Sequence, residues 1–293
     1  MFIDFTDEQK ALREELQTYY ANLITPEIHE LQKLEEGTGP VRRKLVEQLG
    51  EDGWIALGWP EEYGGQGKSA IEQFIFYDET MRVGSPAPML TINTVGPTIM
   101  EYGTDEQKDS FLPEIAAGKL HFCIGYSEPD AGTDLASLAT KAVRDGDEYV
   151  INGKKAWITN GGFAHVFVVT AVTGEDDRGR KEITAFLVDA DSKGLILGKP
   201  EHKMGQCASN TVEVTLDEVR LPASNMIGGR NGFKVMMNGL NSGRIGVAAM
   251  CCGIAQASFD AALEYSHDRT AFGKPLHQLQ AIQLKFSLLY KTD

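Results

Sequence analysis

Two short segments in the middle of the chain carry side chains that could hold a flat ligand. The first, residues 124–134 (IGYSEPDAGTD), is a polar turn in which Gly132 allows the backbone to approach a ligand closely. The second, residues 157–162 (WITNGG), places Trp157 two positions before Thr159 on an alternating stretch, and residues two apart on a strand face the same side. Together they predict a ring that stacks on a planar ligand and hydroxyl groups that bond to its edge.

These two segments resemble the flavin-binding signatures of the acyl-CoA dehydrogenase family. In that family a (T/S)EP-x-(A/G)-G-(S/T)-D loop and a W-(I/T)-(T/S) strand hold the isoalloxazine ring of FAD. The alternative is an ordinary Gly/Pro turn followed by a strand with a tryptophan in the core. Either segment alone would fit that alternative, but both in this order and spacing favour the flavin site.

The elements that must position these residues begin with an N-terminal helical domain, predicted over residues 1–120. Thr6–Gln9 and Thr104–Gln107 have the pattern of capping boxes, which begin helices. Amphipathic patterning over residues 41–49 and 71–82 predicts two more helices.

Residues 121–227 are predicted to form a middle antiparallel β domain or barrel that carries the flavin and acyl-CoA site. The Asn152-Gly153 pair favours a hairpin turn. The other strand candidates are short apolar runs between polar turns, at residues 122–126, 166–172, 183–188, 195–197 and 211–216.

Residues 228–293 return to helical patterning. Phe233–His267 predicts one long helix, and a second is expected over residues 276–290 with Pro275 near its first turn. The fold class is therefore α+β, like that of the acyl-CoA dehydrogenases: an N-terminal helical domain, a middle β domain and the first part of a C-terminal helical bundle.

The composition limits the kinds of partner. The chain has 293 residues, of which 42% are hydrophobic and 24% charged, as is typical of a globular protein. The formal net charge of −14 argues against a nucleic-acid surface, because no excess of cations could neutralise phosphates. A polyanionic ligand such as coenzyme A would need only a few local cations.

The four cysteines predict neither a metal site nor a disulfide framework. Adjacent Cys251 and Cys252 lie in an apolar helical run and are predicted, like Cys123 and Cys207, to be small buried core residues. The N-terminus does not resemble a secretory signal, and no stretch is expected to span a membrane, so we expect a cytoplasmic protein.

Further motifs of the same family follow in order along nearly the whole chain. Trp59–Gly67 resembles an early (P)E-x-(Y/F)-GG-x-G loop. Arg269-x-x-Phe272-Gly273 with Gln280 resembles the motif that reaches the FAD phosphates, usually across a subunit interface. The remaining matches are Tyr102–Lys108 with Leu112-Pro113, Met204-Gly205 and Asn231-Gly232-Phe233.

The resemblance implies a role for each matching residue. Ser127 and Thr159 would bond the flavin edge, and Trp157 would pack on the ring face. Without the family pattern, Arg244 and Arg269 would be ordinary surface arginines. The set implied for FAD is Tyr126, Ser127, Gly132, Thr133, Trp157, Ile158, Thr159, Arg269, Phe272 and Gln280, and the set implied for the acyl-CoA substrate is Thr133, Asn241 and Arg244.

The catalytic base of the family has no match in the sequence. Most members carry a Glu in a YEGT-like motif near the C-terminus. A minority place it directly before the arginine that matches Arg244, where this chain has Gly243. Because no YEGT-like motif occurs before Asp293, we expect a C-terminally truncated member without the base and without part of the helical bundle.

The resemblance implies an FAD-dependent acyl-CoA dehydrogenase. Such enzymes desaturate an acyl thioester: a carboxylate removes the α-proton, and the β-hydrogen leaves as hydride to flavin N5. The expected electron acceptor is an electron-transfer flavoprotein, and the expected assembly is a homo-oligomer, a dimer or tetramer. Two alternatives keep the fold: a non-catalytic or partner-requiring subunit of a mixed complex, and an acyl-CoA oxidase or flavin monooxygenase.

The two halves of the chain point to different acyl groups. The N-terminal half is similar to actinobacterial enzymes that act on steroid side chains, and the C-terminal half to short-chain acyl-CoA dehydrogenases. The resemblance therefore implies β-oxidation of a fatty acid or of a steroid side chain without choosing between them.

Overall fold

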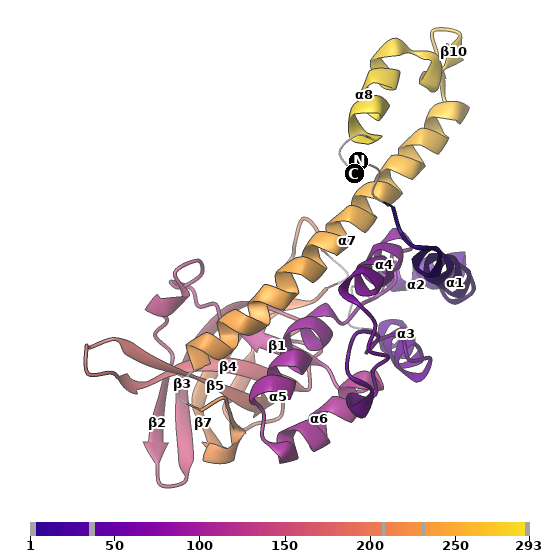
Figure 1. The fold of residues 1–293 in the computed structure, drawn as a ribbon. Coiled ribbons are helices and arrows are strands. Elements are labelled where there is room, and N and C mark those ends of the chain that lie inside the picture. The colour runs from indigo at the N-terminus through magenta and orange to yellow at the C-terminus, as the bar shows by residue number, and fades with distance from the viewer. Residues whose placement is uncertain (1–3, 35–38, 207–208, 230–231, 291–293) are drawn as a thin grey trace. The chain divides into compact units, whose positions relative to one another are not determined.

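The computed structural model describes residues 4–34, 39–206, 209–229 and 232–290 (Figure 1). Predictions that involve Met1–Ile3, Cys207, Asn231 and Asp293 lie outside the described residues.

The chain divides into two compact units, and each is described by itself. The helical unit comprises Met1–Thr25, Ser69–Ala87 and Ile245–Asp293, and the sheet unit comprises Pro26–Lys68 and Pro88–Arg244. The three consecutive domains expected from the sequence stay a prediction.

The helical unit is built on long helices with well-defined starts. Thr6 forms the predicted capping box with Gln9, and Ser69 forms another with Glu72 that we did not predict. Its elements are α1 (Asp7–Leu23), α4 (Ala70–Arg82), the later part of α7 (Gly232–Asp268), β9 (Thr270–Ala271), β10 (Lys274–Pro275), the 3₁₀ turn η5 (Leu276–Gln278) and α8 (Gln280–Tyr290).

Buried polar contacts fix α1 against α4. The guanidinium of Arg13 lies 2.7 Å from a carboxylate oxygen of Asp78 and 3.0 Å from one of Glu79. The hydroxyl groups of Tyr20 and Thr80 are 2.6 Å apart. Because buried charges are costly without partners, these pairings specify one register of the two helices.

The C-terminal helices are as expected in number but not in where the second begins. The long helix predicted over residues 233–267 is confirmed as α7. The predicted start at residue 276, with Pro275 near the first turn, is wrong for the α-helix: Pro275 pairs with Thr270 in the β9–β10 hairpin, and Leu276–Gln278 form the 3₁₀ turn η5. Helix α8 begins only at Gln280.

The prediction that Cys251 and Cys252 are buried is also wrong: both are exposed, whereas Cys123 is buried. One stripe of α7 packs closely on α4, where a Cβ added to Gly253 would lie 2.4 Å from the carbonyl oxygen of Asp78. The two cysteines precede this stripe and point away from it, so an apolar helix sequence did not imply burial on every side.

Helix α7 also departs from the expectation that no stretch could span a membrane. Among the residues that the structure describes, it is long and apolar enough to do so by length and composition alone. Core helices of globular proteins meet the same criterion, so this is weak evidence, and we assign no membrane span.

The sheet unit combines short helices with one large sheet. Its helical elements are α2 (Pro26–Leu34), α3 (Pro40–Glu51), η1 (Glu61–Tyr63), the π-helical turn η2 (Leu90–Val95), α5 (Gly96–Tyr102), α6 (Asp105–Ala116), η3 (Leu135–Ser137), η4 (Ala223–Asn225) and the start of α7. Its strands are β1 (Phe122–Gly125), β2 (Lys141–Asp145), β3 (Glu148–Thr159), β4 (Val166–Glu175), β5 (Lys181–Asp189), β6 (Leu195–Leu197), β7 (Thr211–Pro222) and β8 (Met226–Ile227).

Within the described residues the sheet has the order β6-β7-β3-β2-β4-β5-β8, with β1 also paired to β4. Most pairs are antiparallel as predicted, but β1 and β2 both run parallel to β4. Phe122–Gly125 lies beside Val166–Val169, and Lys141 lies further along, beside Val172. After β1 the chain leaves one edge of β4, and it returns to the same edge at β2. The segment between β1 and β2 contains most of the candidate flavin loop.

The prediction of a hairpin at Asn152-Gly153 is wrong, because β3 continues through this pair. The turn lies earlier, around Gly146, whose φ is +64°. A Cβ added to Gly153 would lie 2.4 Å from Thr140 Oγ1, and the register with β7 shifts at this point. The Asn-Gly pair thus lies opposite a β-bulge in β7, where Glu218 has a φ of 54°, and allows a close approach of backbone rather than a turn.

Helical elements of the sheet unit pack beside β1 (Figure 1). The N–H of Phe122 donates to Thr91 Oγ1 at 3.0 Å, and the rings of Phe122 and Phe111 meet edge to face. The buried indole of Trp59 donates to the carbonyl oxygen of Ile92 at 3.2 Å. The tryptophan of the Trp59–Gly67 motif is therefore part of the core.

Candidate functional site

The two segments singled out in the sequence lie side by side in the sheet unit. The N–H of Ala156, in β3, donates to the carbonyl oxygen of Ser127 at 3.0 Å. The ammonium group of Lys155, also in β3, donates to the carbonyl oxygen of Tyr126 at 3.3 Å. These bonds hold the loop after β1 directly against the strand that carries Trp157 and Thr159.

The loop itself is closed by a tight turn. The N–H of Glu128 donates to the carbonyl oxygen of Ala131 at 2.9 Å, and the N–H of Ala131 donates back at 3.2 Å. Gly132 and Thr133 follow on the exposed side, and no atom lies within 4 Å of a Cβ added to Gly132. The loop therefore presents open backbone and a hydroxyl group to a ligand.

Trp157 is not a core residue: 66% of it is exposed, and its φ is +61°. Ala156 and Ile158 on either side are buried, whereas Thr159 is exposed like Trp157. A left-handed φ is rare for an aromatic residue and costs about 1–3 kcal/mol, so such outliers gather at functional sites. The alternative of a core tryptophan is excluded.

The donors offered here fit the edge of a flavin ring, which carries nitrogen and oxygen acceptors. Among the residues that the structure describes, the N–H of Ser127 has no hydrogen-bond acceptor. The side chains of Tyr126 and Ile158 are buried, so these two residues can reach a ligand only through their backbone. Thr133 and Thr159 offer exposed hydroxyl groups.

Arg269, Phe272 and Gln280 belong to the helical unit, so the structure describes them apart from the flavin-edge residues. Phe272 and Gly273 form the turn of the β9–β10 hairpin with φ values of 52° and 75°. The ring of Phe272 is 93% exposed, and Arg269 and Gln280 are exposed before and after the hairpin. A second aromatic residue therefore has a left-handed backbone and faces outward.

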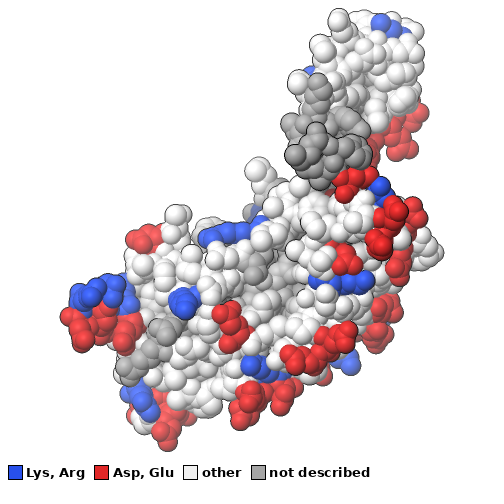
Figure 2. Space-filling view, viewed as in Figure 1, with Lys and Arg blue, Asp and Glu red and all other residues white. Residues whose placement is uncertain are grey.

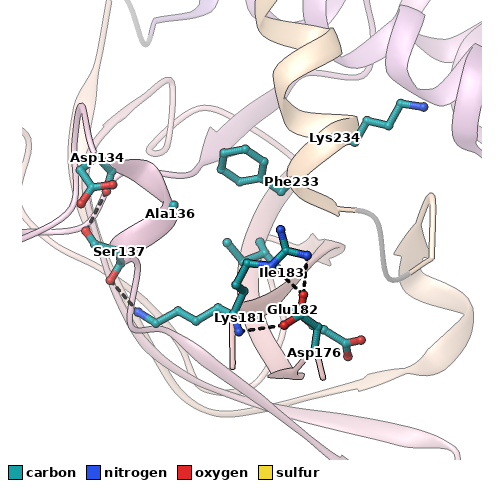
Figure 3. A pocket seen from close by; sticks show the side chains of 10 residues that line it. Asp134, Ala136, Ser137, Asp176, Lys181, Glu182, Ile183, Phe233 and Lys234 are labelled. Carbon is teal, nitrogen blue, oxygen red and sulfur yellow. Dashed lines mark hydrogen bonds and ion pairs between the residues drawn. The ribbon is translucent and has the colours of Figure 1, made fainter. Parts of the chain in front are cut away.

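A cavity of about 890 Å³ lies next to the flavin loop (Figure 3). Phe233, from the first turn of α7, extends toward the segment that contains Ala136. Lys181 Nζ donates to the carbonyl oxygens of Ser137 and Leu138 at 2.9 and 2.8 Å, which ties β5 to this segment. Sequence motifs gave these residues no role, because they converge only in the folded chain.

The cavity has both apolar and charged walls. Ile183, Ala136 and Phe233 supply apolar surface, and Arg180 is held in place by Asp176, whose carboxylate oxygen lies 2.6 Å from the guanidinium. The lining has acidic as well as basic residues, so it suits an amphiphilic ligand with an apolar part and a polar part.

Asn241 and Arg244 meet on α7, where Arg244 Nη1 donates to Asn241 Oδ1 at 2.6 Å. Gly243, between them, packs against η2: a Cβ added there would lie 2.8 Å from Thr94 Oγ1. A larger side chain at this position, such as the glutamate of some family members, would have to displace Thr94.

The sequence analysis gave no role to Lys155, which lies beneath the loop. Its side chain is fully buried and pairs with Glu128 at 2.8 Å. Lys155 continues the alternation of the buried Tyr149 and Ile151, and the register shift that follows it, between Lys155 and Ile158, turns Ile158 inward and Trp157 outward.

Comparison with known families identifies the class of protein that this fold and site define. Models described as the N-terminal, middle and C-terminal domains of acyl-CoA dehydrogenase match residues 6–119, 123–219 and 230–290. The chain belongs to the acyl-CoA dehydrogenase family.

Individual relatives cover most of this chain. It is 47% identical to acyl-CoA dehydrogenase FadE26 of Mycobacterium tuberculosis, over 85% of this chain and 63% of that protein. It is 37% identical to the probable acyl-CoA dehydrogenase YngJ of Bacillus subtilis, over 98% of this chain and 76% of that protein. The chain thus spans less than two thirds of the length of FadE26.

A solved structure shows the same fold. The chain is similar to the ChsE4-ChsE5 complex from Mycobacterium tuberculosis, with a TM-score of 0.87 and 41% identity, over 99% of this chain and 74% of that chain. The predicted fold class is therefore confirmed, with the middle sheet mixed rather than purely antiparallel.

Proposed function

We propose that this protein is an FAD-dependent acyl-CoA dehydrogenase, an oxidoreductase that introduces a double bond between Cα and Cβ of an acyl thioester. The observation that carries the proposal is the hydrogen bond from Ala156 N–H to the carbonyl of Ser127, which sets the open loop beside the exposed, left-handed Trp157. Membership of the family supports the same chemistry.

The chain's own residues would bind and orient the cofactor. When bound, FAD would supply the acceptor for the hydride that leaves Cβ. Ser127 and Thr159 would donate to the edge of the ring, and Trp157 would cover its face. Arg269 would bind the phosphate of an FAD across a subunit interface, as the matching family motif usually does, through its planar guanidinium. The remaining proposed FAD contacts are Tyr126, Gly132, Thr133, Ile158, Phe272 and Gln280.

The acyl-CoA would use the cavity beside the flavin loop. Its apolar wall at Ile183 and Phe233 suits the apolar chain of a pantetheine thioester, and Thr133 precedes the lining residue Asp134. Asn241 and Arg244, joined by a hydrogen bond, would bind the adenine nucleotide end. Removal of the α-proton needs a base. Gly243, packed against Thr94, does not provide one.

The proposal is tested by adding FAD to the purified chain. We expect a yellow protein with a flavin absorbance band near about 450 nm. Bleaching of this band by an acyl-CoA without oxygen also needs a base for the α-proton, so it is measured as a separate outcome. Butyryl-CoA and a steroid side-chain thioester should be compared. A protein that stays colourless after FAD is added would contradict the proposal.

A second candidate is a subunit that works only in a mixed complex. The solved structure of a ChsE4-ChsE5 complex favours this possibility for a relative of similar fold. Copurification from the native source separates the candidates: a stoichiometric second chain supports the mixed complex, and full activity of this chain alone excludes it. A homo-oligomer, an electron-transfer flavoprotein as electron acceptor and a cytoplasmic location stay predictions.

A further inference from the structure

A buried ion pair lies directly under the candidate flavin loop. Lys155 Nζ is 2.8 Å from Glu128 Oε1, and the two side chains are 0% and 7% exposed. Such pairs seldom add net stability compared with apolar residues of similar size, because both charges lose their hydration. Stability alone is therefore a poor explanation for this pair.

Glu128 is held by more than the lysine. Its carboxylate accepts hydrogen bonds from the N–H of Ala139 at 2.6 Å and from the N–H of Thr140 at 3.0 Å. Burial raises the pKa of Glu128, but the bonds from Lys155, Thr140 and Ala139 outweigh burial and leave the pKa below its ordinary value. The carboxylate is therefore anionic at neutral pH, and it fixes the ammonium group in place.

Lys155 has a second acceptor that connects it to the site. It donates to the carbonyl oxygen of Tyr126 at 3.3 Å, so a cation lies behind the peptide group that joins Tyr126 to Ser127. In a trans peptide the N–H points opposite to the carbonyl oxygen. The N–H of Ser127 therefore points away from Lys155, and it has no acceptor among the described residues.

A cation at the oxygen end of a peptide group draws electron density toward that oxygen and makes the N–H at the other end a stronger donor. We propose that Lys155 and Glu128 are positioning residues that polarise the Tyr126–Ser127 peptide, so that the Ser127 N–H binds the electron-rich edge of the flavin and stabilises its reduced form. This inference rests on the proposed function.

The test removes the two charges together. The double substitution K155M/E128Q keeps the length of side chain 128, shortens side chain 155 by one atom and leaves no unpaired buried charge, so the chain is expected to fold where K155M alone could fail. The control is K154M, because Lys154 is the neighbouring lysine on the same strand and is exposed. Both variants lose one lysine, but only the double variant loses the cation behind Tyr126.

Three measurements report on the polarisation of the Tyr126–Ser127 peptide. In the protein without FAD, the amide proton resonance of Ser127 should move upfield in the double variant and stay in place in K154M. The dissociation constant for FAD should rise by up to about tenfold, because the Ser127 N–H remains but becomes a weaker donor without the cation behind its peptide group. The midpoint potential of the bound flavin should fall, which a purely structural role of the pair would not cause.

The outcomes separate the inference from the function on which it rests. A folded double variant with an unchanged Ser127 resonance and an unchanged flavin potential overturns the inference, even when the unsubstituted chain binds FAD. If the unsubstituted chain binds no FAD, the proposed function fails, and the Ser127 resonance still tests the polarisation.

Discussion

At the scale of single residues, the clearest mark of function is the backbone of Trp157. Its φ of +61° is unfavourable for an aromatic residue, and it is kept because Ala156 is bonded to Ser127 and Ile158 is fixed in the core. The folded chain therefore stabilises a conformation that exposes an indole ring beside an open loop.

Substitution of Trp157 should weaken FAD binding while leaving the stability of the folded protein nearly unchanged. Because the side chain is exposed, we expect Trp157→Ala to change the free energy of unfolding by less than about 0.5 kcal/mol. The affinity for FAD should nevertheless fall, as measured by fluorescence titration. The control is Ile158→Ala, next in sequence but only 1% exposed. It should cost about 2–5 kcal/mol in urea unfolding. Equal destabilisation by the two substitutions would contradict this assignment.

His121 is a buried imidazole in the sheet unit. Its ring is tilted by 41° against the ring of Phe163, with the centroids 4.5 Å apart, and it stacks on the ring of His165 at 5.7 Å. Burial, and then the neighbouring charges of His165, Arg42 and Arg43, lower the pKa of His121 from 6.5 to about 3. The folded protein therefore holds this imidazole neutral where the unfolded chain would protonate it.

This difference in the pKa of His121 between the folded and unfolded states predicts that acid lowers the free energy of unfolding. Between the unfolded pKa of 6.5 and the folded pKa of about 3, the unfolded chain binds one more proton, so stability falls as the pH falls through this range. The slope from this group is about 1.4 kcal/mol per pH unit. We expect His121→Gln to flatten the loss of unfolding free energy between about pH 7 and about pH 5. A slope equal to that of the unsubstituted protein would argue against a neutral, buried His121.

At the scale of elements, local signals predicted helices well. The capping boxes at Thr6 and Thr104 mark the observed starts of α1 and α6, because a cap is completed within one turn of its own sequence. Turns were predicted less well. The Asn152-Gly153 pair fits a hairpin locally, but Gly153 packs against Thr140 and Asn152 bonds to Glu218 at a bulge of β7, so β3 continues through the pair.

The close packing at Gly153 and the open surroundings of Gly132 predict different effects of an added methyl group on stability. Gly153→Ala would place a Cβ 2.4 Å from Thr140 Oγ1, and we expect a loss of about 1–3 kcal/mol of unfolding free energy. Gly132→Ala meets no atom within 4 Å and should change stability by less than about 0.5 kcal/mol. Urea unfolding of both variants measures the difference, and a tolerated Gly153→Ala would refute the close approach.

At the scale of the whole molecule, charged side chains and exposed apolar side chains are distributed differently over the surface. Figure 2 shows acidic side chains interspersed with basic ones over the visible face, in keeping with a net charge of −14. Within the helical unit, by contrast, exposed apolar residues gather on α7 and α8. They are Ile245, Val247, Ile254, Leu284, Leu288 and Leu289. Concentrated apolar exposure of this kind is typical of association surfaces.

Association through this surface is testable with a charged residue. Leu288→Glu places a carboxylate on α8 at a residue that is 69% exposed, and it should shift the protein toward monomer in sedimentation at equal concentration. Val143→Glu, at a residue that is 63% exposed on β2, is the matched control and should leave the mass unchanged. If both variants keep the mass of the unsubstituted protein, the surface on α8 does not mediate association.

The sequence by itself determined the family, the order of the helices and the loop and strand of the candidate flavin site, because those signals are local: caps, periodicity and motifs of a few residues. Only the tertiary structure decided that β1 and β2 share one edge of β4, that Trp157 points outward and that Lys155 is buried beside Glu128. These features depend on the pairing of distant strands and on bulges that change register, and a shift of one residue turns a side chain to the opposite face of a sheet. The ion pair of Lys155 with Glu128 under the Ser127 loop exists only through that pairing.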